Sequence, residues 1–223
     1  MTLARKLTAE FLGTALLLAI VIGSGIMAER LADGNMAIAL LANTLATGCG
    51  LLALILLFGP ISGAHFNPLV SIGAIYFKQM EHRTAAAYVA AQVVGALAGV
   101  AAAHCMFDVA LFSASHHVRT GIAQWWSEAI ATFGLLGVII GTSRNNPVST
   151  PYAVAVWIMA AYWFTASTSF ANPAVTLARA MSDSFTGIRP QDVAGFIAAQ
   201  LVGAACALPL FHWLYTPSIK ETQ

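Results

Sequence analysis

Six long apolar stretches follow one another along the chain, separated by short segments that carry most of the charged residues. A helix needs about 20 mainly apolar residues to cross a bilayer, and each stretch is long enough. The predicted membrane spans are residues 8–28, 36–58, 84–107, 122–142, 151–171 and 193–215. This pattern predicts an all-α membrane protein with six transmembrane helices.

Two further apolar pieces, residues 66–77 and 172–181, are too short to cross a bilayer. Each contains an Asn-Pro pair at or near its start, with the asparagine at Asn67 in one and Asn172 in the other. Asparagine is a favoured helix N-cap, and proline suits the first helical position. Each piece is therefore predicted to be a re-entrant half-helix that starts within the membrane.

The sequence also repeats itself once. EFLGTALLLAIVIGS matches EAIATFGLLGVIIGT, HFNPLVSIGAI matches SFANPAVTLAR, and VAAQVVGA matches IAAQLVGA, in the same order. Each copy holds three spans, an odd number, so the second copy enters the membrane from the opposite side. We expect a single domain over residues 1–223, with a first repeat over 8–107 and an inverted second repeat over 122–216. Sites in such folds form between the repeats near the midplane.

Inversion brings Asn67 and Asn172 together from opposite faces of the membrane. Non-helical backbone at this depth is tolerated only where it is buried in protein or lines a watery cavity. Two helix N-termini direct partial positive charge at one place, which opposes cations and orients a hydroxyl group by its oxygen. Residues 61–66 and 165–171 would add carbonyl acceptors in a row. The arrangement predicts a path for small neutral polyols or hydroxides.

Two glutamates, Glu10 and Glu128, lie within predicted spans at equivalent positions of the two repeats. Ionisable groups in a membrane usually face the protein interior. One interpretation is a proton relay, as in a coupled transporter. The other, favoured by the symmetry, is that each carboxylate accepts hydrogen bonds from the backbone of a re-entrant loop. The symmetric pair Gln92 and Gln200 is expected to brace the loops in the same way, and His65 is expected to brace the first loop.

Composition agrees with a membrane protein, because 59% of the residues are hydrophobic and 9% are charged, against roughly a quarter charged in soluble domains. The formal net charge of +1 gives no indication of a nucleic-acid or acidic partner. Cys49, Cys105 and Cys206 are scattered through apolar stretches. They form neither a disulfide framework nor a metal-ligand spacing, and no metal or cofactor is predicted.

The orientation in the membrane is predicted from lysine and arginine in the short loops. One side holds Arg5, Lys6, Lys78, Arg83, Arg144 and Lys220, and the other holds Arg30, Arg119, Arg179 and Arg189. The larger number of lysine and arginine residues on the first side favours it as the inner side. Both termini are then expected in the cytoplasm.

The paired motifs SGAHFNP (62–68) and ANPAVTLAR (171–179) resemble those of the major intrinsic proteins, the aquaporins and aquaglyceroporins. The resemblance covers roughly residues 8–216. It implies a passive channel in each protomer of a homotetramer, with small neutral solutes and water as its cargo and no enzyme activity. The first motif departs from the family's usual Asn-Pro-Ala, because Leu69 follows the proline. The matching motif residues are Asn67, Pro68, Leu69, Asn172, Pro173 and Ala174.

The resemblance also locates the family's outer selectivity filter. Members usually carry an arginine directly after the second Asn-Pro-Ala, where this chain has Val175. The other filter positions are expected at Thr47, Ala160 and Ser169, so the filter would be wide and nearly uncharged. Such a filter favours an aquaglyceroporin over a water-selective channel. Residues 171–190 are similar to those of bacterial members linked with arsenic resistance, which implies a bacterial inner membrane and metalloid hydroxides such as arsenite, or organoarsenicals, among the solutes.

Arg179 lies one helical turn after Val175 and has two interpretations. It either adds positive charge to the outer vestibule or caps the carbonyl groups at the end of the half-helix.

Several rival functions remain open at this point. Inverted repeats and broken helices also occur in secondary transporters, but those need a titrating relay, for which only Glu10 and Glu128 are candidates. A water-selective aquaporin shares the fold. No H-E-x-x-H or G-x-S-x-G motif indicates an intramembrane enzyme. A structural junction protein of this fold would transport nothing.

Overall fold

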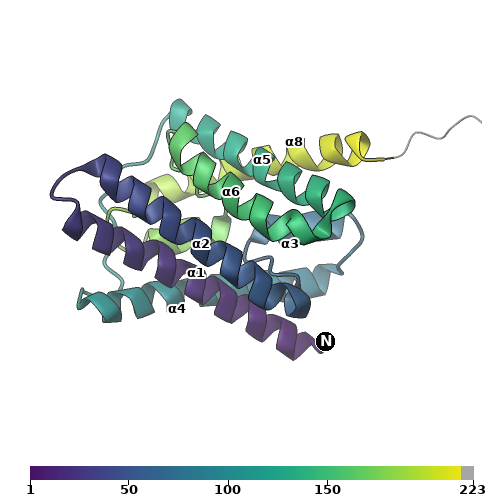
Figure 1. Ribbon diagram of the computed structural model, residues 1–223, viewed down its shortest axis with the longest axis horizontal. Coiled ribbons are helices and arrows are strands. Elements are labelled where there is room, and N and C mark those ends of the chain that lie inside the picture. Colours follow the sequence, from purple (N-terminus) through teal and green to yellow (C-terminus); the bar gives the residue numbers. More distant parts are fainter. Residues whose placement is uncertain (217–223) are drawn as a thin grey trace, which may run out of the picture.

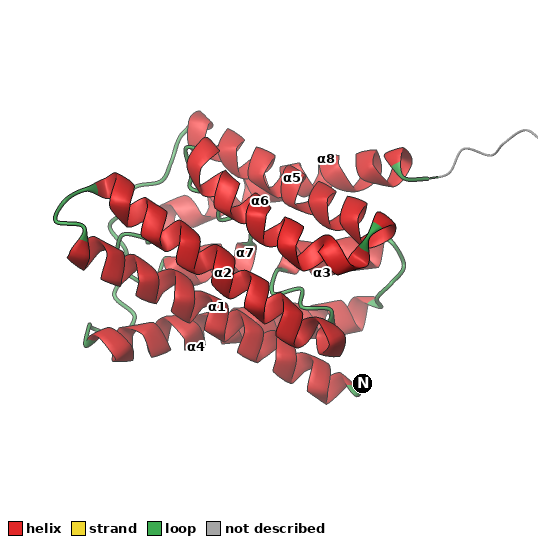
Figure 2. Cartoon of the chain, in the orientation of Figure 1, coloured by secondary structure: helices red, strands yellow, loops and turns green. Residues whose placement is uncertain are grey.

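The structure, a computed structural model, describes residues 1–216, and these form helices and loops (Figure 2). The helices are α1 (Leu3–Leu31), α2 (Met36–Ser62), α3 (Pro68–Tyr76), α4 (His82–Phe107), α5 (Ile122–Asn145), α6 (Thr150–Phe164), α7 (Pro173–Arg179) and α8 (Val193–Leu214), with short 3-10 turns η1 (Pro147–Ser149) and η2 (Pro190–Asp192). Lys220 and the C-terminus, both placed on the inner side above, lie outside the described residues.

Six long helices run side by side, and the half-helices α3 and α7 lie between them (Figures 1 and 2). Helix α1 begins and helix α8 ends at the same end of the bundle (Figure 1). The prediction of six main helices and two re-entrant half-helices is confirmed. The half-helices are shorter than predicted, because the residues before each proline are extended.

One predicted span is wrong in its length. Within residues 1–216, five helical segments are long and apolar enough to cross a membrane, whereas α6 has 15 residues and ends at Phe164. Residues 165–171, which the apolar pattern assigned to the fifth span, form an irregular loop. Serine and threonine compete with helix formation by bonding to nearby backbone, and this loop contains three left-handed residues, Thr168, Ser169 and Ala171. The loop is thus part of the re-entrant segment that leads into α7.

The two halves of the chain pack in the same way. Helix α1 packs on α2 and α4, and helix α5 packs on α6 and α8. Glycines allow the closest approaches, since a Cβ added at Gly95 would lie 2.4 Å from the carbonyl oxygen of Phe11. A Cβ at the equivalent Gly203 would lie 2.3 Å from the carbonyl oxygen of Ala129. Both contacts are with helix backbone, which cannot rotate away as a side chain can.

We predict that Gly95→Ala lowers the free energy of unfolding by about 1–3 kcal/mol, the usual cost of overpacking. The physical reason is that α4 must move away from α1 to admit the methyl group. Thermal unfolding of the detergent-purified protein measures the effect. Gly59→Ala in α2 is the matched control, because a Cβ there has no atom within 4 Å. Equal stability of the two variants would show that the close contact does not matter.

Candidate functional site

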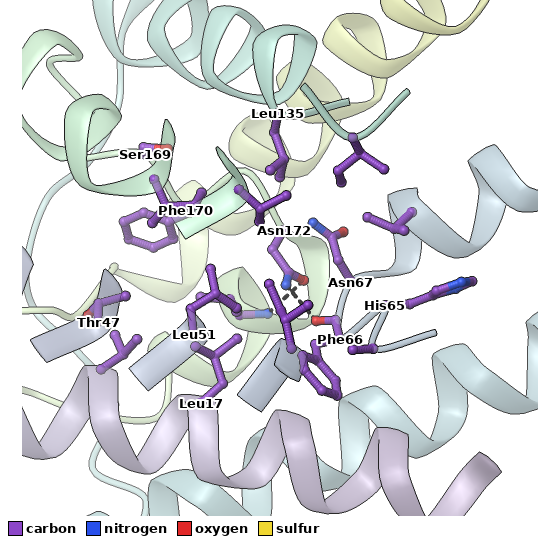
Figure 3. A pocket seen from close by; sticks show the side chains of 18 of the residues that line it. Leu17, Thr47, Leu51, His65, Phe66, Asn67, Leu135, Ser169, Phe170 and Asn172 are labelled. Carbon is purple, nitrogen blue, oxygen red and sulfur yellow. Dashed lines mark hydrogen bonds between the residues drawn. The ribbon is translucent and has the colours of Figure 1, made fainter. Parts of the chain in front are cut away.

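A cavity of about 120 Å³ lies where the two halves of the bundle meet (Figure 3). Its walls come from α1, α2, α5 and α6, from both half-helices and from the loops that lead into them. In Figure 3, Thr47, Ser169 and Phe170 lie on one side of the Asn67–Asn172 pair and His65 lies on the other. The cavity therefore passes the point at which the two half-helices meet.

The two asparagines cap their half-helices in the same way. Asn67 and Asn172 have extended backbones, and the side-chain oxygen of each accepts a hydrogen bond from the backbone two residues on. The distances are 2.9 Å from the nitrogen of Leu69 and 3.0 Å from that of Ala174. These bonds satisfy amide groups that the start of a helix leaves unpaired.

The amide nitrogens of the same side chains cross between the two loops. Nδ2 of Asn67 donates to the carbonyl oxygen of Ala171 at 2.8 Å, and Nδ2 of Asn172 donates to that of Phe66 at 2.7 Å. Each amide has a second N–H, and both asparagines line the cavity. The crossed bonds join the half-helices, and one donor of each asparagine is left for a solute.

The neighbouring motif residues are buried in the packing. Pro68 and Pro173 occupy the first turns of α3 and α7. Leu69 is buried against Leu136, Ala204 and Leu208 of α5 and α8, whereas Ala174 belongs to the main core beside the cavity. The larger side chain at position 69 thus packs against α5 and α8, and Leu69 is not among the residues that line the cavity.

Glu10 is fully buried and accepts four hydrogen bonds, from the end of α2, the first re-entrant loop and α4. Its oxygens receive the backbone N–H groups of His65 at 2.9 Å and Phe66 at 2.8 Å. They also receive the hydroxyl of Ser62 and the side-chain amide of Gln92, at 2.6 and 2.8 Å. A carboxylate with this many donors is a fixed acceptor for the loop.

Glu128 makes the equivalent contacts in the second half. It accepts the backbone N–H groups of Phe170 at 2.8 Å and Ala171 at 2.9 Å. The hydroxyl of Ser167 and the amide of Gln200 each lie 2.6 Å from its oxygens. Both networks are therefore built from a carboxylate, a serine, a glutamine and two loop amides.

His65 lines the cavity and is held from two sides. Its Nδ1 lies 3.0 Å from the hydroxyl of Ser71, and its ring packs edge-on against Tyr88. The amide of Gln92 reaches the same Ser71 hydroxyl at 3.2 Å. His65 is thus connected to the Glu10 network through Ser71.

The loops that these networks hold are conformationally strained. Ala64 and Phe66 in the first loop have positive φ, and so do Ser169 and Ala171, which precede the second asparagine by the same spacing. Each such residue costs about 1–3 kcal/mol and persists only when its surroundings impose it. The hydrogen bonds to the two buried carboxylates supply that constraint.

Three of the four expected filter residues lie together. Thr47, Ser169 and Val175 line the cavity and are buried. The hydroxyl of Ser169 has no hydrogen-bond partner among the residues that the structure describes.

The fourth position was assigned wrongly. Ala160 is exposed on the outer face of α6, and the residues of this helix that line the cavity include Val154, Ile158 and Tyr162. These three are four residues apart and so share one helical face, whereas Ala160 is two residues out of step. The sequence analysis missed Tyr162, whose hydroxyl lies 3.4 Å from that of Thr47. The cavity wall beside Thr47 therefore includes an aromatic side chain and is not made of small residues alone.

Arg179 is only 2% exposed and also lines the cavity. Its Nε donates to the carbonyl oxygen of Thr186, in the loop after α7. This hydrogen bond is therefore not one to a carbonyl group at the end of the half-helix. Its guanidinium carbon lies 3.4 Å from the ring centroid of Phe170.

Arg119, which no motif singled out, is a second buried arginine near the same ring. Its guanidinium carbon lies 5.1 Å from the ring centroid of Phe170. It donates to the carbonyl oxygens of Gly187 at 2.8 Å and Ser167 at 3.1 Å. Burial lowers the pKa of Arg119 to about 10, so the side chain stays protonated at neutral pH. A buried arginine in a loop has no sequence signature, which is why only the structure reveals it.

A family model described as "Major intrinsic protein" matches residues 1–150 and 141–223 of the chain. The chain belongs to the major intrinsic protein family. As a member, it is an integral membrane protein of a channel family that passes small solutes and water. Within its described residues, no group of three or more histidine, cysteine or acidic side chains is placed to hold a metal ion.

This major intrinsic protein is 53% identical to aquaglyceroporin AqpS of Rhizobium meliloti (strain 1021), over 99% of this chain and 95% of that protein. It is 30% identical to aquaporin-2 of Rattus norvegicus, over 99% of this chain and 82% of the relative. The X-ray structure of the aquaglyceroporin from Plasmodium falciparum matches with a TM-score of 0.64 and 19% identity, covering 96% of each chain. At that identity the last match shows the fold alone.

We predict that Glu10→Gln destabilises the protein by about 1.5–3 kcal/mol, the value of one hydrogen bond to a charged group. The new amide places an N–H donor where the loop already presents donors. Thermal unfolding in detergent measures the loss, with Glu81→Gln as control, because Glu81 is exposed and makes no side-chain capping bond. A variant of normal stability that alters only the pH dependence of transport would instead indicate a proton relay.

Proposed function

We propose that the protein is a passive aquaglyceroporin-type channel whose outer filter lacks the usual arginine. The observation that carries the proposal is Val175, which lines the cavity beside Thr47 and Ser169 at the position where family members place the cation. The solutes are small and neutral: glycerol-like polyols, metalloid hydroxides such as arsenite, organoarsenicals, and some water.

The cavity offers a solute both polar and apolar contacts. The spare N–H groups of Asn67 and Asn172 are donors to a solute. Leu17 and Leu51 supply apolar wall from α1 and α2. A solute with hydroxyl groups on one side and carbon or a metalloid on the other matches such walls better than water alone does.

The corrected filter narrows the range of solutes. Tyr162 is 4% exposed and lies next to Thr47, so the opening is bounded by an aromatic ring on the α6 side. Val175 is the uncharged side chain from α7. The filter is therefore wider and less polar than one with arginine, and the position of Tyr162 sets the largest solute that passes.

The buried carboxylates argue against a coupled transporter. Among the described residues, the carboxylates of Glu10 and Glu128 accept hydrogen bonds from loop amides, serine hydroxyls and glutamines, and neither glutamate lines the cavity. A proton relay needs a titrating group on the transport path. We infer passive flow along the solute gradient.

The assembly and orientation follow from the family and the loop charges. We infer a homotetramer in a bacterial inner membrane, with both termini cytoplasmic. Helix α1 begins and helix α8 ends at the same end of the bundle (Figure 1), which is consistent with this orientation.

We predict that proteoliposomes containing the protein swell faster than empty liposomes in gradients of glycerol, urea and arsenous acid. Stopped-flow light scattering measures the rates, with methylated arsenicals as a further set and water as reference. Empty liposomes serve as the control. Fast water flow with no acceleration of any of these solutes would contradict the proposed filter.

We predict that Val175→Arg slows the larger solutes at least about tenfold more than water, equivalent to about 1.4 kcal/mol in barrier height. The guanidinium would occupy the lumen beside Ser169 and hold water. Val118→Arg is the matched control, because Val118 is exposed in the loop before α5. An equal loss for water and for glycerol would show that position 175 does not discriminate by size.

A further inference from the structure

The residue that follows Val175 by one helical turn is a buried arginine on the same cavity. Val175 and Arg179 both line it, and residues four apart lie on one face of a helix. Among the residues that the structure describes, the Arg179 guanidinium makes one hydrogen bond, from Nε to the carbonyl oxygen of Thr186. Because Arg179 is among the residues that line the cavity, part of its side chain borders the lumen. Arg179 therefore places a positive charge on the same wall of the cavity, one helical turn from the uncharged Val175.

The charge of Arg179 is not neutralised by a carboxylate. In the part of the chain that the structure describes, the ion pairs are His116–Asp183 and Arg189–Asp192. The guanidinium instead lies against the ring of Phe170, an arrangement that stabilises a partly desolvated cation. The positive potential of Arg179 therefore extends into the cavity.

Arg119 does not replace Arg179 in this respect. It is not among the residues that line the cavity. Its nitrogens are used by Gly187, Ser167 and the hydroxyl of Thr168. It adds positive charge behind Phe170, whereas Arg179 is the arginine that a solute meets.

We propose that Arg179 is a specificity-determining residue of the pore, which excludes cations and donates hydrogen bonds to solute oxygens in place of an arginine at position 175. This inference rests on the proposed function of the same cavity. A filter arginine would both narrow the lumen and supply positive charge. In this chain, Val175 widens the lumen beside Ser169, while Arg179 supplies the charge one helical turn away.

The test compares urea with guanidinium, a neutral and a cationic solute of nearly the same shape. Wild-type proteoliposomes are expected to pass urea and to exclude guanidinium. Arg179→Met keeps an unbranched side chain against Phe170 and removes the charge, so the ratio of guanidinium to urea flux rises at least about tenfold. Arg179→Lys keeps the charge and the low ratio. Because urea flux is the internal reference, the ratio does not depend on how much protein is folded.

Two further variants sharpen the assignment. Arg30→Met removes an exposed arginine outside the cavity, at the end of α1, and should leave the ratio unchanged. Val175→Arg combined with Arg179→Met returns the charge to the same wall, and the low ratio is restored.

Several outcomes would overturn the proposal. The first is a wild-type protein that passes guanidinium as fast as urea. The second is an Arg179→Met protein that passes urea but still excludes guanidinium. The others are a high ratio of guanidinium to urea flux in Arg179→Lys, and a double variant that does not exclude guanidinium again. A wild-type protein that passes neither urea nor glycerol would contradict the proposed function instead. In that case, guanidinium flux gained by Arg179→Met would still support Arg179 as the barrier to cations.

Discussion

The two loops that enter the bundle depend on the carboxylates of Glu10 and Glu128. Irregular backbone at this depth has no water to satisfy its amide groups, and several of its residues adopt left-handed conformations. Each carboxylate accepts two loop N–H groups and a serine hydroxyl, and so fixes the path of the loop. The asparagine caps, the crossed amide bonds and the cavity all require the loops to hold that path.

The two halves share this support but differ where they face a solute. Ser62 and Ser167 make the same contact with their glutamates, and Gln92 and Gln200 do as well. The cavity wall has no such symmetry, because Phe170 takes the place of His65 of the first loop and Arg179 takes the place of Ala74 of α3. The repeated part of the sequence holds the two loops, and the part that differs between the repeats lines the cavity around Phe170.

The apolar pattern and the Asn-Pro pairs were sufficient to predict the main helices and the half-helices, because both rest on local rules of burial and capping. The filter position at Ala160 was predicted by spacing from the asparagines, and this failed. Helix α6 ends at Phe164. A position counted back from Asn172 therefore crosses an irregular loop, and the count does not tell which residues of α6 face the cavity. Arg119 was missed for another reason: its partners are loop carbonyls that are distant in sequence.

The crossed asparagine bonds have a consequence for biosynthesis. Asn67 donates to a carbonyl 104 residues further along the chain, and Asn172 to one 106 residues earlier. During translation the first loop therefore emerges long before its partner exists. The nascent first half must wait in the membrane with its half-helix unjoined, so the lumen closes into its final shape only after the second half has been inserted.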